Sequence, residues 1–131
     1  MDDPRADRVA SGSPYEQTVG FSRAVRSGRH VYVSGTAPVW PDGHVDPDPL
    51  VQARRCWEIA LDALARLGGS PADVVRTRSF LTDRAHEAAA SRAHGEVFGD
   101  VRPVTAMIGV ATLLDPRMLV EIEADAYLGA D

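Results

Sequence analysis

The sequence predicts a single small α/β domain of the α+β type, in which one β-sheet carries two helices on the same face. The chain has 131 residues, the usual size of one domain with one hydrophobic core. Apolar residues recur at strand spacing in some segments and at helix spacing in others, in the order β-β-α-β-α-β-β. Strand-helix crossovers place both helices on one face of the sheet. We therefore expect one domain over residues 1–131, with residues 1–12 as a flexible tail.

The charge pattern argues against several classes of partner. The formal net charge is −5, and the basic residues form no run, so no surface for nucleic acid is predicted. The acidic N-terminus lacks the apolar run of a signal peptide, and no stretch approaches the roughly 20 apolar residues that span a bilayer. We expect a cytoplasmic protein that binds neither nucleic acid nor membrane.

The cysteine and histidine pattern predicts no metal site. Cys56 is the only cysteine, and its place beside Trp57 favours a packing role over a nucleophilic one. No HExxH or paired CxxC spacing involves the histidines, which are His30, His44, His86 and His94.

Two strands and a loop are predicted over residues 20–49. The runs SRAVR and HVYVSG flank Ser27-Gly28, which is the composition of a hairpin turn between antiparallel strands. The segment Pro38–Pro49 holds four prolines and an Asp-Gly pair, so it is a connecting loop. Trp40 in this loop either lines a pocket or anchors the loop, and the second interpretation is favoured.

The clearest predicted helix begins after Asp48, which can accept a hydrogen bond at the N-cap, with Pro49 at the first helical position. Gly68 and Gly69 end it. Its apolar stripe consists of Leu50, Ala53, Trp57, Ala60, Leu61, Leu64 and Leu67. The opposite face carries two pairs at i,i+4 spacing, Arg54 with Glu58 and Asp62 with Arg66. We interpret this charged face as exposed to solvent.

A capped turn at Ser70–Asp73 precedes a predicted strand over Val74–Leu81. Arg76, Arg78 and Phe80 share one face of that strand. A second helix then runs from Asp83 to about Phe98. Near its end, His94 and Glu96 are interpreted as a solvent-facing pair and are left out of the candidate site.

The last two predicted strands, residues 104–113 and 118–128, flank Asp115-Pro116 as a final hairpin. The second alternates strictly, so Glu121, Glu123 and Asp125 share the face opposite the apolar residues. A sheet face that mixes apolar and charged residues is better covered by partner subunits than left in water. We therefore expect an oligomer.

Three segments resemble the YjgF/Rid (RidA-like, endoribonuclease L-PSP) family. They are GFSRAVRSGRHVYVSGT at residues 20–36, SPADVVRTRSFLTD at residues 70–83, and RPVTAMIGV followed by LVEIEADAY, so the resemblance covers roughly residues 20–128. It implies a chorismate-mutase-like homotrimer with small-molecule pockets at the subunit interfaces. It also implies that active members hydrolyse reactive enamines or imines, such as 2-aminoacrylate, to a 2-keto acid and ammonia, without a cofactor.

The resemblance fails at the arginine that grips the substrate carboxylate. The family places it in a Pro-x-Arg-Ser stretch, whereas this chain has Pro103-Val104-Thr105-Ala106. Losing charge-assisted bonds of about 1.5–3 kcal/mol weakens a carboxylate ligand roughly ten- to a hundredfold. Other pocket positions also differ from the family pattern: Phe21 stands for its tyrosine, Arg23 for its glutamine, Ser91 for its asparagine and Met107 for its cysteine.

Two features of the family pattern remain. Glu121 matches the glutamate that holds the attacking water, although it can also be read as a salt-bridged strand carboxylate. The run Ser34-Gly35-Thr36 ends a strand where backbone N–H groups can meet a ligand, although a glycine there is often only a turn. Arg23 either replaces the lost arginine or pairs with Glu121 or Glu123 as structure, and the second is favoured.

The resemblance favours an enamine or imine hydrolase (deaminase) that acts on a reactive intermediate other than the simplest 2-aminoacrylate-type substrates. The alternative is a trimeric small-molecule binding or regulatory protein without turnover, which the replaced pocket residues favour.

Overall fold

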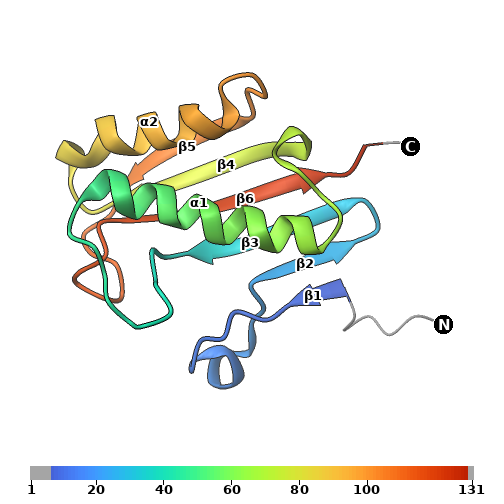
Figure 1. Cartoon of the computed structure of the whole chain (residues 1–131), viewed down its shortest axis with the longest axis horizontal. Helices are drawn as coiled ribbons and strands as arrows, with labels where there is room; N and C mark the ends of the chain where they lie inside the picture. The colour runs from blue at the N-terminus through green and yellow to red at the C-terminus, as the bar shows by residue number, and fades with distance from the viewer. Residues whose placement is uncertain (1–6, 130–131) are drawn as a thin grey trace.

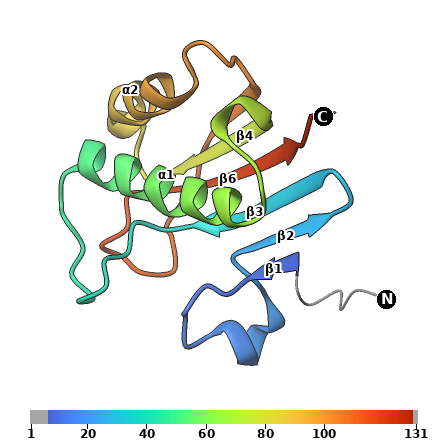
Figure 2. The ribbon, with the colours of Figure 1, turned by 45° about the vertical axis from the view of Figure 1, so that its right-hand side comes forward.

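The computed structural model describes residues 7–129, which form one six-stranded sheet in the order β1-β2-β3-β6-β4-β5. The strands are β1 (Arg8–Val9), β2 (Ala24–Ser27), β3 (His30–Thr36), β4 (Val74–Leu81), β5 (Val104–Gly109) and β6 (Val120–Tyr127). The two α-helices, α1 (Pro49–Arg66) and α2 (Glu87–Phe98), lie on the same face of the sheet (Figure 1). Figure 2 shows α1 over β3 and β6, with α2 toward β4. The predicted fold class and helix placement are confirmed.

The predicted first hairpin is confirmed, with β2 and β3 paired antiparallel around Gly28. Gly28 has φ 62°, a left-handed conformation that the absence of a Cβ makes accessible. The expected flexible tail is wrong at residues 8–9, because β1 pairs with β2 and the Val9 carbonyl accepts from the Arg23 N–H at 2.7 Å. Residues 1–6 of that tail lie outside the described residues.

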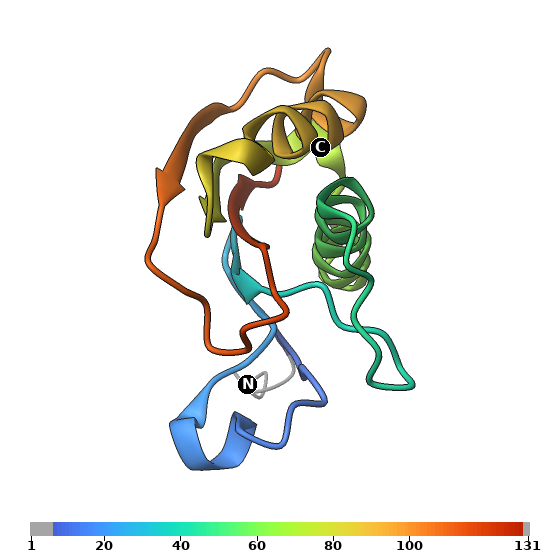
Figure 3. The ribbon, with the colours of Figure 1, turned by 90° about the vertical axis from the view of Figure 1, so that its left-hand side faces the viewer.

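A five-residue π-helix, η2 (Glu16–Gly20), was not predicted. It lies between β1 and β2, so it projects from the edge of the sheet on the N-terminal segment. Figure 3 shows this segment (blue) at the opposite end of the molecule from α2.

Helix α1 begins as predicted, with an Asp48 carboxylate oxygen accepting from the Leu50 N–H at 2.8 Å. Its buried stripe is rotated relative to the prediction. Gln52, Cys56 and Ala63 are fully or almost fully buried, whereas Leu50 and Leu61 are only partly buried. The reason is that the sheet and α2 together cover a broader face of α1 than the apolar side chains alone indicate.

Gln52 is the buried polar residue that explains part of this rotation. Its amide nitrogen donates to the carbonyls of Asp46 at 2.7 Å and Arg117 at 3.0 Å, and its oxygen accepts from the Leu119 N–H at 2.7 Å. A buried amide costs free energy unless its donors and acceptor are satisfied, and these three bonds satisfy them. Gln52 therefore ties two loops to α1.

Only one of the two predicted surface ion pairs on α1 forms. Asp62 and Arg66 are paired at 3.1 Å. Arg54 instead donates to Glu96 of α2 at 2.6 Å and 2.9 Å, and Glu58 pairs with Arg55. Arg54 pairs with Glu96 because two parallel charge-assisted bonds are more stabilising than a single i,i+4 contact.

The predicted turn, strand and second helix are confirmed with adjusted bounds. A capping box joins Ser70 and Asp73 at the 3-10 turn η3 (Pro71–Asp73), and β4 follows. The Asp83 carboxylate accepts from the Ala85 N–H at 2.7 Å, but the first turn is a 3-10 helix, η4 (Arg84–His86), and α2 starts only at Glu87.

The predicted final hairpin is wrong. β5 pairs parallel with β4, while β6 lies between β3 and β4 and is antiparallel to both. β5 also ends at Gly109 rather than at residue 113. The alternating apolar side chains of β6 are buried under the helices, which favours the centre of the sheet for β6, and β5 is left at the edge.

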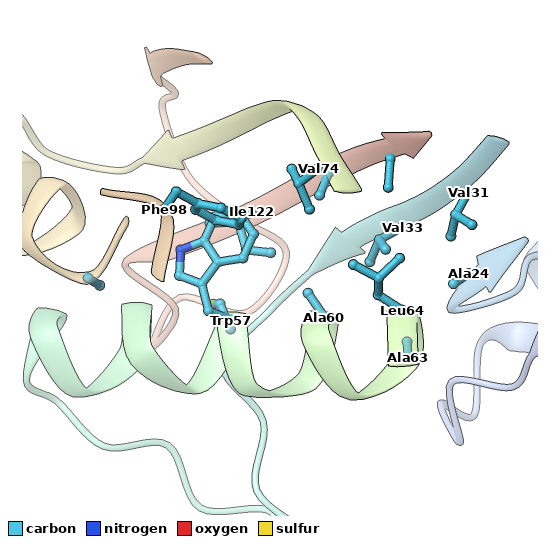
Figure 4. Close-up of a cluster of buried hydrophobic side chains, with 14 of the residues drawn as sticks. Ala24, Val31, Val33, Trp57, Ala60, Ala63, Leu64, Val74, Phe98 and Ile122 are labelled. Atoms are coloured by element: carbon cyan, nitrogen blue, oxygen red, sulfur yellow. The ribbon is translucent and has the colours of Figure 1, made fainter. Parts of the chain in front are cut away.

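The core lies between the helices and the sheet (Figure 4). Trp57 of α1 packs edge-on against Phe98 of α2, with ring centroids 4.9 Å apart. Leu64 and Ile122 are each 1% exposed. Burying such an aliphatic side chain contributes about 1.5–3 kcal/mol, so this layer fixes the helices over the sheet.

Candidate functional site

Strand register divides the predicted site residues between the two faces of the sheet. Thr105 pairs with Thr77 and Met107 with Ser79, so all four side chains lie on the face that the helices cover. Glu121 pairs with Phe80, so its side chain lies on the opposite, open face. The predicted residues therefore form two clusters within one chain.

One cluster surrounds the end of β3 and contains Arg23, Ser34, Gly35, Thr36 and Glu121. The Glu121 side chain lies on the open face, whereas Thr36 pairs with Ile122 and is buried on the face that the helices cover. The Arg23 guanidinium donates to the Gly35 carbonyl at 3.1 Å and to the Thr36 hydroxyl at 3.0 Å. The Thr36 hydroxyl donates to the Ser34 carbonyl at 2.8 Å, and the Ser34 hydroxyl donates to the Arg23 carbonyl at 3.0 Å. These bonds hold the strand end in place beside the Glu121 carboxyl group.

Gly35 leaves the space that the Glu121 carboxylate occupies. A Cβ at position 35 would lie 3.0 Å from a Glu121 carboxylate oxygen, tighter than an ordinary contact. β3 is also irregular here, because its register with β6 shifts between Val33 and Thr36. The glycine therefore serves a close approach, and the predicted alternative of a simple turn is not what the structure shows.

The environment of Glu121 raises its pKa above the ordinary value. Burial raises the pKa of Glu121 and the charge of Glu123 raises it further, while the Arg23 guanidinium opposes both. Burial also lowers the pKa of Arg23, and the Glu121 charge opposes this. A raised pKa makes the carboxylate a stronger base, which is the property that accepting a proton from water requires.

Glu123 has a structural partner, unlike the prediction that Arg23 pairs with it. The Arg78 guanidinium binds Glu123 at 2.8 Å and lies 4.0 Å from Asp125. Arg23 instead binds the end of β3 and acts on Glu121 electrostatically. Among the described residues Arg23 forms no ion pair with Glu121 or Glu123, and its replacement of the lost arginine stays a prediction.

The helix-face cluster contains Ser91, Thr105 and Met107. The Ser91 hydroxyl of α2 lies 3.7 Å from the Met107 sulfur of β5. Thr105 is exposed on the edge strand, and its hydroxyl lies 2.7 Å from the Thr77 hydroxyl. Phe21 belongs to neither contact set and follows the π-helix, with its N–H donating to the Glu16 carbonyl at 3.2 Å.

His94 is the residue that sequence reasoning missed. It was interpreted as solvent-facing, but it is half-buried and its Nε2 lies 2.8 Å from the Thr77 hydroxyl. Its ring packs against Trp57 at 5.8 Å and Phe98 at 4.8 Å between centroids, and burial lowers the pKa of His94. Its place four residues before Phe98, on the face of Ala90, was the signal in the sequence. Glu96 is solvent-facing as predicted and binds Arg54.

Cys56 has the predicted packing role. Its side chain is fully buried, with the sulfur 3.7 Å from the Val120 carbonyl. Burial raises the pKa of the Cys56 thiol, so it stays protonated and unreactive. Trp40 likewise behaves as a loop anchor, since it stacks on His44 at 4.7 Å and contacts the Arg55 guanidinium.

A groove of about 390 Å³ lies between the N-terminal segment and α1, away from Glu121. Arg23 is the predicted site residue in its walls. Acidic and basic side chains of α1 line the other side. Within residues 7–129 no cluster of three or more histidine, cysteine or acidic side chains is arranged to hold a metal ion. Over the same range, no helix has both the length and the apolar character required to cross a membrane.

Comparison with known proteins identifies the family of this chain. The family model for endoribonuclease L-PSP matches residues 12–128. A protein of Streptomyces coelicolor, SCO2049, is 41% identical over 124 residues that cover 94% of this chain and 92% of the relative.

Solved structures share the whole fold. The crystal structure of Rv2704 from Mycobacterium tuberculosis, a member of the YjgF/YER057c/UK114 family, matches with a TM-score of 0.84 and 43% identity over 92% of this chain and 98% of that one. RidA from a Psychrobacter species matches with a TM-score of 0.79 and 27% identity over 94% and 95% of the two chains. The chain therefore belongs to the YjgF/RidA family, which the endoribonuclease L-PSP model describes.

Proposed function

We propose that the chain is an enamine or imine hydrolase of the Rid type, acting on a reactive small molecule other than the simplest 2-aminoacrylate-type substrates. The observation that carries this proposal is Glu121, a half-buried carboxyl group with a raised pKa on the open sheet face. Gly35 leaves room for this carboxyl group, and the Arg23 charge acts on it. Family membership supports the same activity.

The chemistry needs one water molecule and one proton carrier. The imine carbon is already electrophilic, so the carboxylate of Glu121 takes a proton from water as the water oxygen bonds to that carbon. The nitrogen gains that proton and then the remaining hydrogen of the added hydroxyl group, the carbon–nitrogen bond breaks, and ammonia leaves a carbonyl product. No cofactor enters this balance.

The proposal includes a homotrimer with ligands bound between subunits. Glu121 and Thr105 lie on opposite faces of one sheet, so a site that uses both clusters takes them from two copies of the chain. The open face supports subunit contact because it exposes large apolar side chains beside its charges. These side chains are Tyr32, Val104, Ile108 and Tyr127.

Thr105 supports a substrate other than an amino-acid imine. A threonine hydroxyl offers one neutral hydrogen bond, whereas a guanidinium offers two charge-assisted bonds to a carboxylate. Residue 105 therefore favours a neutral substrate group at this position, such as an amide, an ester or a hydroxyl.

The second candidate is a small-molecule binding protein without turnover. It is favoured by the side chains that replace the family's pocket residues, namely Phe21, Arg23, Ser91, Thr105 and Met107. This candidate predicts ligand-induced thermal stabilisation with no product formed.

The test is consumption of imines, trapped with semicarbazide, with and without the protein. The imines are generated from a panel of amino acids by an amino-acid oxidase and, for substrates without a carboxylate, from a panel of amines by an amine oxidase. Faster consumption that is lost in Glu121→Gln and kept in Glu123→Gln supports the hydrolase, because Glu123 is the neighbouring strand carboxylate already paired with Arg78. If no imine is consumed faster by the folded protein, hydrolysis of this panel is excluded and the binding protein is the better candidate.

A further inference from the structure

Three polar side chains from different elements form a continuous chain of hydrogen bonds beneath the edge of the sheet. The Nε2 atom of His94 on α2 lies 2.8 Å from the Thr77 hydroxyl on β4. That hydroxyl lies 2.7 Å from the Thr105 hydroxyl on β5. The chain therefore begins at a half-buried imidazole and ends at an exposed hydroxyl.

Burial restricts the hydrogen bonds of Thr77, the middle residue of the three. Thr77 is 0% exposed, so its hydroxyl has no water to bind and finds its partners in His94 and Thr105. A hydroxyl carries one hydrogen, so Thr77 donates to one of these partners and accepts from the other. An unpaired buried hydroxyl hydrogen is costly, which couples the two ends.

Only two arrangements satisfy all three groups. In the first, the Nε2–H of His94 donates to Thr77, Thr77 donates to Thr105, and the Thr105 hydrogen is free to donate to a ligand. In the second, every bond is reversed, so Nε2 accepts and the Thr105 hydrogen points inward. Thr105 then presents only lone pairs outward and accepts from a ligand.

We propose that His94 and Thr77 are positioning residues that set whether Thr105 donates to or accepts from a bound ligand. The relay suits a neutral ligand group that both donates and accepts hydrogen bonds, such as a primary amide or a hydroxyl. This assignment of ligand class rests on the proposed function, whereas the relay itself does not.

The charged groups around the relay do not control it directly. Arg54 of α1 and Arg92 of α2 both pair with Glu96 at the surface, and Arg76 and Arg78 of β4 lie on the opposite sheet face. Trp57 and Phe98 are the apolar neighbours of the ring, and burial lowers the pKa of His94. The imidazole is therefore neutral at physiological pH, so both arrangements are available.

The test is ¹⁵N NMR of the four histidines in the full-length protein, with His94→Gln used to assign the signal. Thr105→Val removes the only outward partner of Thr77, so the Thr77 hydrogen must point to Nε2. We expect the neutral ring to shift to the Nδ1–H tautomer. We also expect the pKa of His94 to fall further, because protonated His94 would leave the Thr77 hydrogen without an acceptor.

The matched control is Thr105→Ser, which keeps the hydroxyl and is expected to keep the wild-type tautomer and titration. Position 105 is exposed, so both variants are expected to fold, and circular dichroism checks this. If Thr105→Val leaves the tautomer and titration of His94 unchanged, the relay does not exist and Thr77–His94 is a local structural bond.

The ligand class is tested separately, by comparing the consumption of two imines of equal size, one bearing a carboxylate and one a carboxamide. A preference for the carboxamide that Thr105→Arg reverses supports the assignment, and a carboxylate preference in the wild-type protein overturns it. If neither imine is consumed, the hydrolase and this ligand class both fail for these imines. The NMR result still decides the relay.

Discussion

Gly35 lies so close to the Glu121 carboxyl group that a Cβ atom at position 35 would displace it. A Cβ at position 35 would approach a Glu121 carboxylate oxygen to 3.0 Å, while the backbone there needs no left-handed conformation. The carboxylate is the end of a flexible side chain, so it moves at little cost in stability. Its position relative to a ligand, however, is lost.

We therefore predict that Gly35→Ala lowers imine consumption at least tenfold while changing the free energy of unfolding by less than about 1 kcal/mol. Urea denaturation and the trapping assay measure the two quantities. Gly109→Ala is the matched control, because nothing lies within 4 Å of a Cβ at position 109. Equal activity in the two variants would contradict the role given to this approach.

Arg23 tunes Glu121 through its charge. The guanidinium lowers the pKa of Glu121 against the effects of burial and of Glu123. Arg23→Gln removes this charge, so the pKa of Glu121 is expected to rise further.

The acid limb of the pH–rate profile should then move to higher pH, because the carboxylate form acts as the base. Arg26→Gln serves as the control, since Arg26 binds the carbonyls of Gly28 and Leu67 instead. An acid limb that does not move in Arg23→Gln would show that Glu121 is not the titrating base.

At the scale of elements, α2 is held to α1 and β4 partly through a histidine that is buried neutral. Burial lowers the pKa of His94 below its ordinary value of 6.5, so the folded protein binds fewer protons at this site than the unfolded chain. The contribution of neutral His94 to the free energy of unfolding is therefore fully present above pH 6.5 and is lost as the pH falls below it.

The prediction is that the melting temperature falls between pH 7 and pH 5, and that His94→Gln flattens this dependence. Thermal melts at matched ionic strength measure it. His30→Gln is the control, because His30 is an exposed histidine on β3. An equal flattening in both variants would place the effect elsewhere.

The strand order has a consequence for the edges of the sheet. β5 pairs on one side only, with β4, and it carries Thr105 and Met107 beneath it and Val104 and Ile108 on the open face. This edge strand therefore brings Thr105 and Met107 to the border of the subunit. A neighbouring subunit can reach it there.

For the whole molecule, the mixed open face predicts self-association. Val104 is 60% exposed on that face. We expect the wild-type protein to sediment as a trimer of the 14.1 kDa chain, and Val104→Asp to shift it toward monomer through a buried, unpaired charge.

Analytical ultracentrifugation measures this. Val19→Asp is the control, because Val19 is 70% exposed on the π-helix at the other edge of the molecule. A wild-type monomer, or a trimer that Val104→Asp leaves intact, would exclude this face as the interface.

The sequence by itself determined the two α-helices and the strands from β2 to β6, the cap at Asp48 and the face on which Glu121 lies. Each of these depends on residues close together in the chain: a carboxylate two residues before an N–H, apolar side chains at a fixed period, and strict alternation in β6. The identity of residue 105 was also a matter of sequence alone. Such local signals do not depend on how the rest of the chain is arranged.

Only the tertiary structure decided the rest of the site. The insertion of β6 between β3 and β4, the pairing of β1 and the burial of His94 depend on contacts between residues far apart in the sequence. Several strand orders could cover the same apolar surface. The sequence of a single strand or helix does not determine which order has the lowest free energy. That competition placed Thr105 and Glu121 on opposite faces, and it joined Thr105 to a histidine.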